Sequence, residues 1–457
     1  MKTYDVVVCG AGISGAVAAI AAGREGCSVL LVDRLGYPGG MLTAGGVGPM
    51  MTFHAGETQV VQGITGELID RMAAKGLSTG HVMDTTLYTY TVTPFDAEGM
   101  KIELEDMLIE AGVTMLYHAT LSEVHTDGNE VKRLTFAVKS GKIEVAAKIF
   151  IDATGDADLA YMAGVPCDKG MDDEGTCQPL TTNMKLINVD ISAVKTFMRE
   201  NPKEFPRMRS NEIIANTARL SINGYLTELK AAQDSGELNV PRECVLIFET
   251  NNANEVIVNM SRMQSFDPTD PWALSQAETT GRQQARELIR FLNKRIRGFE
   301  NAIMVQTSPG QVGVRSSRQI IGLYTLTHID LIKGTRFDDT IVHGGYPIDI
   351  HEPKGGYSPE FLALTPEEIA MGDGHVYCVP YRSLLNAKLT NLITVGRCIS
   401  ADFIAQSAIR VSPIAGAIGH GGGAAAALAV KQNKMPVDVD AQDLRALLLK
   451  QKAYLEA

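Results

Sequence analysis

The sequence predicts an α/β fold that starts with a Rossmann-type dinucleotide-binding unit and continues into a β-meander and a mixed α+β domain. The two apolar runs Tyr4–Cys9 and Ser28–Asp33 flank an Ala-rich stretch of helical composition, Gly15–Gly26. Glycines follow the first run at the spacing of a phosphate-binding turn. A strand-like run, Asn391–Val395, and a Gly/Ala-rich helix that ends near Lys434 return to this pattern late in the chain.

Length and composition describe an ordinary globular protein with more than one structural unit. The chain has 457 residues, which exceeds the size at which a single core stops growing. Hydrophobic residues make up 45% and charged residues 21% of it. The formal net charge of −11 argues against nucleic acid or an anionic membrane as partner. A small anionic substrate remains compatible with this acidity, because a few buried arginines can set the field inside a pocket.

The seven cysteines are scattered and include no C-x-x-C pair. This pattern is typical of reduced thiols in a cytoplasmic protein, and it excludes a thioredoxin-type dithiol. We expect no metal site and no iron–sulfur cluster. The stretch Val6–Gly23 is as apolar as a signal-peptide core, but Asp5 precedes it and its glycines have dinucleotide-binding spacing, so we interpret it as structure. We expect no membrane span.

The remaining elements follow from periodicity and from glycines between the runs. A helix is expected at Ala97–Ala111, with Leu104, Met107 and Leu108 on its buried face. Three further strands are expected at Thr114–His118, Glu130–Val138 and Lys142–Ile151. They are interpreted as a small β-meander inserted before a strand at Lys148–Asp152. An amphipathic helix is expected at Pro271–Gly298 and a last one at Asp440–Leu455.

These elements predict four segments. They are the first part of the dinucleotide-binding domain (1–163), an inserted substrate domain (164–372), the second part of the first domain (373–435) and a C-terminal helical segment (436–457).

The glycine-rich turn predicts how a dinucleotide is held. Gly10 allows the tight turn, Gly12 lets the backbone approach a pyrophosphate, and Gly15 permits close helix–strand packing. The helix N-terminus then presents free N–H groups to the phosphates. Asp33 is expected to accept hydrogen bonds from ribose hydroxyls. We therefore predict a nucleotide site at Gly10, Gly12, Ser14, Gly15, Asp33 and Arg34.

Two later segments join this prediction. The strand that ends in Ile151–Asp156 passes into small residues, which suits a backbone close to a cofactor. After Val395–Arg397, Ser412 is a good N-cap and Pro413 a good first helical residue. The glycines that follow leave one face of the expected helix without side chains. The segment is therefore either a helix whose N-terminus points at the cofactor or a tightly packed core helix. These glycines are Gly416, Gly419 and Gly423.

Several motifs resemble the FAD-dependent oxidoreductase family of the glutathione-reductase-like flavoprotein superfamily, which includes flavin subunits similar to the A subunit of heterodisulfide reductase. They extend essentially from end to end and are Val6–Gly15, Pro38–Gly45, Asp152–Asp156, Gly313–Arg318, Tyr346–His351, Val379–Arg382 and Gly396–Ala401. The resemblance implies a non-covalently bound FAD in a split Rossmann-type domain, with an inserted mixed α+β substrate domain facing the flavin. It also implies cofactor contacts at Gly40, Met41, Leu121, Ala153, Thr154, Gly155, Gly396, Arg397, Ser412 and Ile414. A helix that begins at Ser412 would stabilise negative charge on a reduced flavin.

The chain departs from the electron-transfer members of this family. It lacks a cysteine cluster for iron–sulfur centres, and no second strand-GxGxxG-helix unit provides an NAD(P)H domain. We therefore expect electrons to be exchanged with a substrate that lies directly against the flavin.

Candidate catalytic residues come from the same segments. Arginines bind carboxylates, and histidine or tyrosine can move a proton during hydride transfer. We predict catalytic roles for His351, Arg410, His54 and Tyr381, with Arg315, Arg318 and Arg382 as further candidates. Each has a structural alternative, as a salt-bridge partner or a core histidine.

The predicted function is hydride transfer between flavin N5 and a small polar substrate by an FAD-dependent dehydrogenase or reductase. A flavin subunit that passes electrons to a partner protein's redox centres is the alternative, and a purely structural FAD is a third. Flavin monooxygenase chemistry and a homo-oligomer stay open.

Overall fold

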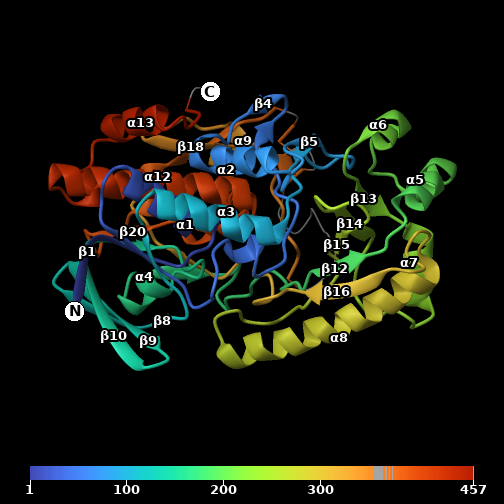
Figure 1. The fold of residues 1–457 in the computed structure, drawn as a ribbon, viewed down its shortest axis with the longest axis horizontal. Coiled ribbons are helices and arrows are strands. Elements are labelled where there is room, and N and C mark those ends of the chain that lie inside the picture. Colours follow the sequence, from blue (N-terminus) through green and yellow to red (C-terminus); the bar gives the residue numbers. More distant parts are fainter. Residues whose placement is uncertain (354–363, 366–367, 370, 373, 456–457) are drawn as a thin grey trace.

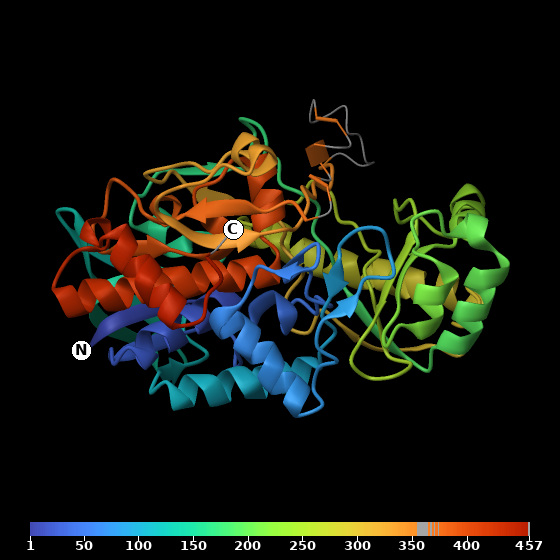
Figure 2. The same cartoon turned by 90° about the horizontal axis from the view of Figure 1, so that it is seen from above.

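The computed structural model describes residues 1–353, 364–365, 368–369, 371–372 and 374–455. A main lobe carries both ends of the chain, and an outer lobe, defined as residues 184–307, stands to one side of it (Figure 2). The predicted boundary between 372 and 373 falls on residue 373, which lies outside the described residues.

The main lobe is built on a mixed sheet. Among the described residues this sheet has seven strands, in the order β7-β2-β1-β10-β9-β8, with β20 also paired to β10. The strands β7, β2, β1, β10 and β20 run parallel, as in a Rossmann unit. Their bounds are β1 (Lys2–Cys9), β2 (Val29–Val32), β7 (Thr114–Leu116), β8 (Thr120–Asp127), β9 (Glu130–Val138), β10 (Gly141–Asp152) and β20 (Leu392–Thr394). The predicted fold class is therefore confirmed.

Two details of the predicted meander were wrong. The runs expected at Lys142–Ile151 and Lys148–Asp152 form one strand, β10, whose first half pairs with β9 and whose second half pairs with β1. The run at Thr114 belongs to the parallel sheet beside β2, and the third strand of the meander is the unpredicted β8. Polar residues dominate β8, so its sequence carries little strand signal.

Helices cover the sheet of the main lobe. The helix α12 comes from the end of the chain and lies against α1 from its beginning (Figure 1). The helices are α1 (Ile13–Arg24), α2 (Gly63–Ala74), α3 (Ala97–Glu110), α4 (Asp158–Met162), α9 (His328–Lys333), α11 (Phe403–Ile409), α12 (Ser412–Gln432) and α13 (Ala441–Lys450). By length and composition α12 could cross a membrane, but 83% of its most apolar window is buried inside the protein, as in a core helix.

The outer lobe is an antiparallel sheet covered by helices. The strand order is β13-β14-β15-β12-β16. Its elements are β12 (Met184–Ile187), α5 (Ile191–Glu200), α6 (Asn211–Asn216), β13 (Ser221–Gly224), α7 (Leu226–Asp234), β14 (Val245–Glu249), β15 (Val256–Val258), α8 (Pro271–Arg295) and β16 (Ile303–Thr307). Asp270 caps α8, whose Leu288 belongs to the core of this lobe. Ala277, near the start of α8, packs in a separate small core with Leu180, Met263, Val312 and Val314.

The remaining elements of the described residues are short. They are the pairs β3 (His54–Ala55) with β4 (Thr58–Gln59), β5 (Val82–Met83) with β6 (Thr91–Val92), β11 (Cys167–Lys169) with β17 (Arg318–Ile320), and β18 (Thr340–Gly344) with β19 (Tyr377–Pro380), and the short helices η1 (Gly40–Leu42), η2 (Pro202–Glu204), η4 (Tyr381–Leu384), η5 (Gly396–Cys398) and η6 (Pro436–Asp438). Side chains from Leu326 to Ile350 pack into the core of the main lobe. The boundaries of the predicted substrate domain stay a prediction.

Candidate active site

The three glycines of the first turn differ in what surrounds them. Gly10 has a φ of +100°, and a Cβ there would lie 2.4 Å from the carbonyl oxygen of Ala153. A Cβ on Gly15 would lie 1.8 Å from the carbonyl oxygen of Gly10. The fold itself therefore requires these two glycines. A Cβ on Gly12 would meet only the Gly40 Cα, at 3.9 Å.

Gly12 caps the N-terminus of α1 without a side-chain hydrogen bond to the helix. The protein leaves space in front of it, at the end of a helix whose first N–H groups have no intrahelical partner. This is the arrangement that a dinucleotide pyrophosphate needs.

Asp33 tightens the same turn. Its carboxylate accepts hydrogen bonds from the backbone N–H of Ala11 at 2.6 Å and of Leu35 at 2.8 Å. Burial raises the pKa of Asp33 above its ordinary value, although these backbone N–H groups oppose the change. A carboxylate has about four acceptor positions, so acceptor capacity remains for a ribose hydroxyl. Arg34 is exposed beside it.

The other predicted cofactor segments converge on this turn. The Gly39 N–H donates to the Ala11 carbonyl at 2.8 Å, so the loop that carries Gly40 and Met41 lies along the turn. The Ala153 N–H donates to the Cys9 carbonyl at 2.8 Å and starts the segment of Thr154 and Gly155.

Arg397 holds the late segment in place. Its Nη2 lies 2.7 Å from Asp156 Oδ1, and a Cβ on Gly155 would lie 3.1 Å from its guanidinium carbon. A Cβ on Gly396 would lie 2.8 Å from Ser14 Oγ. Leu121 lies on β8, two residues after Ala119, whose N–H donates to the Asp33 carbonyl. The sites of actual cofactor contact stay a prediction.

The helix α12 is both closely packed and directed at the site. A Cβ on Gly419 or Gly423 would lie about 2 Å from backbone oxygens of α1, so the glycines allow the two helices to touch. Val411, and not Ser412 as predicted, is the N-cap residue, and no side chain caps the helix. Ser412 occupies the first turn and faces a cavity together with Val411. Ile414 is buried in the core.

This cavity has a volume of about 920 Å³ and lies between the two lobes. The main lobe contributes Met41, Gly48, Arg397, Val411 and Ser412 to its lining, and the outer lobe contributes Asn223, Arg242, Leu246, Phe248, Asn259 and Arg262. Further lining residues from outside the outer lobe are Tyr88, Arg315, Tyr346, Asp349, His351 and Arg410. Its size is at the upper end of the range for small-molecule sites, which leaves room for part of a cofactor and a substrate.

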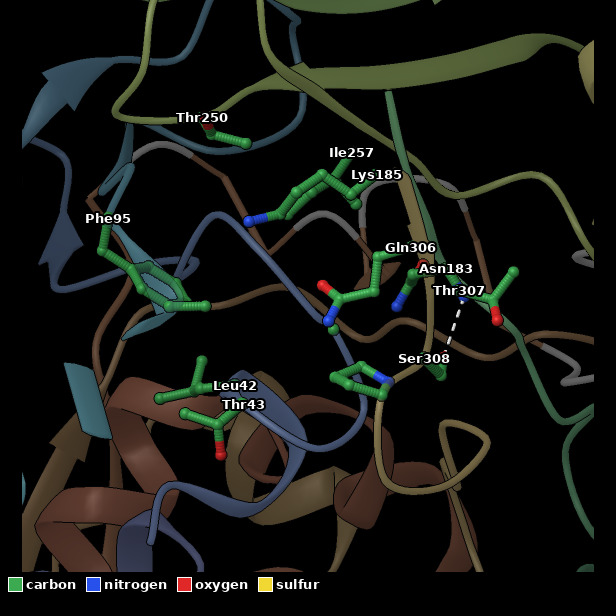
Figure 3. Close-up of a pocket in the computed structure, with 13 residues that line it drawn as sticks. Leu42, Thr43, Phe95, Asn183, Lys185, Thr250, Ile257, Gln306, Thr307 and Ser308 are labelled. Atoms are coloured by element: carbon green, nitrogen blue, oxygen red, sulfur yellow. Dashed lines mark hydrogen bonds between the residues drawn. The ribbon is translucent and has the colours of Figure 1, made fainter. Parts of the chain in front are cut away.

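A second cavity lies between η1 and the outer lobe (Figure 3). Its volume of about 20 Å³ holds about one water molecule. Lys185, which points into it, has its Nζ 3.4 Å from Glu255 Oε1. This cavity cannot hold a substrate.

Asp349 organises a polar cluster in the large cavity. Its Oδ2 lies 3.0 Å from Arg410 Nη2, 3.1 Å from the donating Tyr346 hydroxyl, and 3.5 Å from His351 Nε2. Burial alone would raise the pKa of this carboxyl, but His351 and Arg410 hold it well below its usual range. Burial, followed by the positive charge of Arg315, lowers the pKa of His351 to about 3. At neutral pH the cluster therefore contains an ionised Asp349 and a neutral His351.

The predicted catalytic residues are only partly brought together. His351 and Arg410 line the cavity, while His54 and Tyr381 do not belong to its described lining. The His54 ring nitrogen Nδ1 pairs with the Thr91 hydroxyl at 2.9 Å, and the buried Tyr381 hydroxyl donates to the Pro436 carbonyl at 2.8 Å. A structural role fits these contacts of His54 and Tyr381 better than a catalytic one, because their polar atoms already form hydrogen bonds within the protein.

The further candidates also divide. Arg315 lines the cavity, whereas Arg318 is paired with Asp158 at 2.9 Å and Arg382 lies over the ring of Tyr324. No sequence motif indicated that Arg242, Arg262 and Tyr88 belong to the site, because the segments that carry them have no recognisable motif. The Arg-Glu-Cys sequence after Pro241 carried no periodic signal.

All seven cysteines are free, and Cys9 and Cys398 are buried. In the described part of the chain no three His, Cys, Asp or Glu side chains gather as metal ligands.

Comparison with protein families places the chain. The model of the FAD dependent oxidoreductase family matches residues 5–448, so the chain belongs to this family and is an FAD-binding enzyme. No curated protein matches the chain. The placement among glutathione-reductase-like proteins and the similarity to heterodisulfide reductase stay predictions.

Solved structures of flavin-dependent and related proteins are similar to the chain. CndH, a myxobacterial chondrochloren halogenase and FAD-dependent enzyme, has a TM-score of 0.50 at 11% identity, over 98% of this chain and 78% of that chain. A geranylgeranyl bacteriochlorophyll reductase-like protein from Thermoplasma acidophilum has a TM-score of 0.48 at 13% identity, over 99% and 85%. The p-nitrophenol 4-monooxygenase PnpA from Pseudomonas putida DLL-E4 has 0.47 at 11% identity, over 99% and 85%. At such identities the likeness concerns the fold alone.

Proposed function

We propose that this enzyme transfers a hydride between FAD and a small polar substrate bound in the cavity between the lobes, with His351 as the proton-transfer group. One observation supports this most directly. The cavity brings the predicted cofactor segments, at Met41, Arg397 and Ser412, together with His351 and Arg410 in a single lining.

The residues of the first turn fit an FAD. The space in front of Gly12, the uncapped N-terminus of α1 and the remaining acceptor positions of Asp33 match a diphosphate and a ribose. When bound, FAD supplies a two-electron acceptor and donor.

The chain's own groups then manage the proton. A neutral His351 can accept a proton from a substrate hydroxyl, and the negative charge of Asp349 stabilises the resulting imidazolium. In the reverse direction the same imidazolium returns the proton. Arg410 and the Tyr346 hydroxyl fix the Asp349 carboxylate, and the backbone N–H of His351 donates to Gln178 Oε1 at 3.1 Å, which orients the loop.

The first experiment identifies the compound or protein that exchanges electrons with the bound flavin. The full-length FAD-loaded protein is mixed anaerobically with a panel of hydroxy acids, enoates and sugar derivatives, and flavin absorbance is followed. We expect at least one hydroxy compound to bleach the flavin, or one enoate to reoxidise the chemically reduced protein. Reaction only with a ferredoxin-like protein would instead support the electron-transfer subunit.

A variant pair tests the proton-transfer role. His351→Ala should keep its flavin but slow flavin reduction by substrate by at least about tenfold, at the low end of what general acid–base catalysis contributes. His328→Ala is the matched control, because His328 is also half-buried beside a carboxylate, Asp402, but does not belong to the described cavity lining. An unchanged rate in His351→Ala would remove His351 from the mechanism.

A further inference from the structure

Two buried arginines of the large cavity form no ion pair with any described carboxylate. Arg242 is 7% exposed and Arg315 is 8% exposed. Among the described residues, the Arg242 side chain has neither an ion pair nor a hydrogen bond, and its Nε is fully enclosed. Within the described part of the chain, Arg315 donates to uncharged oxygens alone, the Pro179 carbonyl and the Thr181 hydroxyl.

The neighbouring arginines differ from these two. Arg262 Nη1 lies 3.0 Å from Glu243 Oε1, Arg410 pairs with Asp349, and Arg397 pairs with Asp156. Arg207, the remaining arginine of the lining, is exposed to solvent. The interior of the cavity thus carries two guanidiniums that no described carboxylate contacts directly, although Glu243 and Asp349 attract Arg242, and Asp349 attracts Arg315, at longer range.

Such charges are costly for a folded protein. A guanidinium removed from water is stabilised only if an anion and hydrogen-bond acceptors replace its hydration. Other arginines of the cavity repel these two charges. Burial, followed by the positive charge of Arg262, lowers the pKa of Arg242, and burial, followed by the positive charge of Arg410, lowers the pKa of Arg315. An anion bound in the cavity would replace the lost hydration of these guanidiniums and would offset the repulsion among the arginines.

The two guanidiniums belong to different segments. Arg242 precedes β14 in the outer lobe, and Arg315 lies in the segment before β17. Both line the same cavity, in which Arg315 lies close enough to His351 to influence its charge. Each guanidinium can bind one carboxylate through two hydrogen bonds, so the two together can hold a ligand with two carboxylates.

We infer that the substrate is a small dicarboxylate, with one carboxylate bound by Arg242 and the other by Arg315, beside His351. This inference rests on the proposed function and names the substrate class of that same site.

Binding of charge-matched probes tests it. Dissociation constants for malonate, succinate and glutarate, and for the monoamide and diamide of each, are measured on the FAD-loaded enzyme by calorimetry at constant ionic strength. We expect at least one dicarboxylate to bind about tenfold or more tightly than its monoamide. Equal affinity within every series, or tighter binding of inorganic phosphate, would overturn the inference.

Substitutions locate the charge. Arg242→Gln should weaken binding of the best dicarboxylate by about 10- to 100-fold, the usual loss when a hydrogen-bonded ion pair is removed, and should abolish its preference over the monoamide. Arg242→Lys, which keeps the charge, should restore part of this preference. Arg199→Gln is the control, because Arg199 is an exposed arginine on α5 of the same lobe, and it should change nothing. Unchanged affinity in Arg242→Gln would contradict the assignment.

Stability separates a ligand-binding arginine from a structural one. Arg242→Met removes an uncompensated buried charge, so the melting temperature of the substrate-free enzyme should stay equal or rise while dicarboxylate binding is lost. A lower melting temperature or loss of FAD would show that Arg242 supports the fold and would overturn its role as an anion anchor.

The anaerobic assay distinguishes this inference from the proposed function. Arg242-dependent dicarboxylate binding in a protein whose flavin no small molecule reduces would contradict the proposed function but support the anion site. Rapid flavin reduction by an uncharged metabolite, at the same rate in Arg242→Gln, would overturn the anion site alone.

Discussion

Gly12→Val should abolish FAD binding without unfolding the protein. Gly15→Val should abolish FAD binding and also unfold the protein. The difference follows from the surroundings of the two glycines. A Cβ on Gly12 has 3.9 Å to its nearest heavy atom, and Gly12 has φ −58° and ψ 172°, which other residues adopt. A Cβ on Gly15 would overlap a backbone oxygen at 1.8 Å, which cannot move without opening the turn.

The expected magnitudes differ accordingly. A poor N-cap residue at position 12 costs about 0.5–2 kcal/mol of stability. The overlap at position 15 exceeds the about 1–3 kcal/mol of ordinary overpacking, because it involves rigid backbone. Bound FAD itself stabilises the wild type, so the comparison must use the protein stripped of flavin.

The assay combines flavin content per chain with thermal unfolding of the flavin-free proteins. We expect Gly12→Val to be colourless, to refuse added FAD, and to unfold within about 2–4 °C of flavin-free wild type. Stoichiometric flavin in Gly12→Val would refute the role of this turn. A flavin-free Gly12→Val that unfolds as early as Gly15→Val would refute the argument from open space.

Three further outcomes follow from the site. Between pH 6.5 and about 3 the unfolded chain binds a proton at His351 that the folded protein does not, so the free energy of unfolding should fall with falling pH, by up to about 1.4 kcal/mol per unit from this group. Denaturant unfolding of His351→Gln should show a shallower pH slope, and an unchanged slope would contradict the low pKa. Tyr381→Phe should leave the rate of flavin reduction unchanged and cost about 1 kcal/mol of stability, since its hydroxyl serves only the Pro436 carbonyl among described partners; a tenfold slower reduction would return Tyr381 to the mechanism. Arg410→Met should keep FAD, raise the pKa of Asp349 and slow flavin reduction by substrate in stopped-flow measurements, because it removes the 3.0 Å ion pair that helps keep Asp349 ionised; a wild-type rate would exclude Arg410 from that role.

The parts of the fold that the sequence could predict are those with local signals. The turn at Gly10–Gly15 combines strand, glycines, helix and acid within about one supersecondary unit. The helix α3 follows its predicted bounds to within a residue, since Asp96 caps it and Leu104, Met107 and Leu108 repeat at helical spacing. In contrast, β8 is polar and short of β-branched residues on one side, so its pairing with β9 decides its structure.

The site was less predictable because it depends on long-range contacts. His351 and Arg410 were found through motifs, but the sequence could not show that Asp349 joins them, or that the Tyr381 hydroxyl is already bonded to Pro436. Arg242 is a single arginine before a strand, and only the folded structure places it in the lining of the cavity. A buried cation without a partner is a property of the folded chain and has no local signature.

The contact between α1 and α12 has a consequence for how this protein is made. The phosphate-binding turn lies near residue 10, but its helix packs on glycines near residue 420, and β20 joins the sheet only at residue 392. During synthesis these late segments follow the turn by nearly four hundred residues. The complete cofactor site therefore cannot form before the residues around 420 have left the ribosome, and the flavin cannot occupy it earlier.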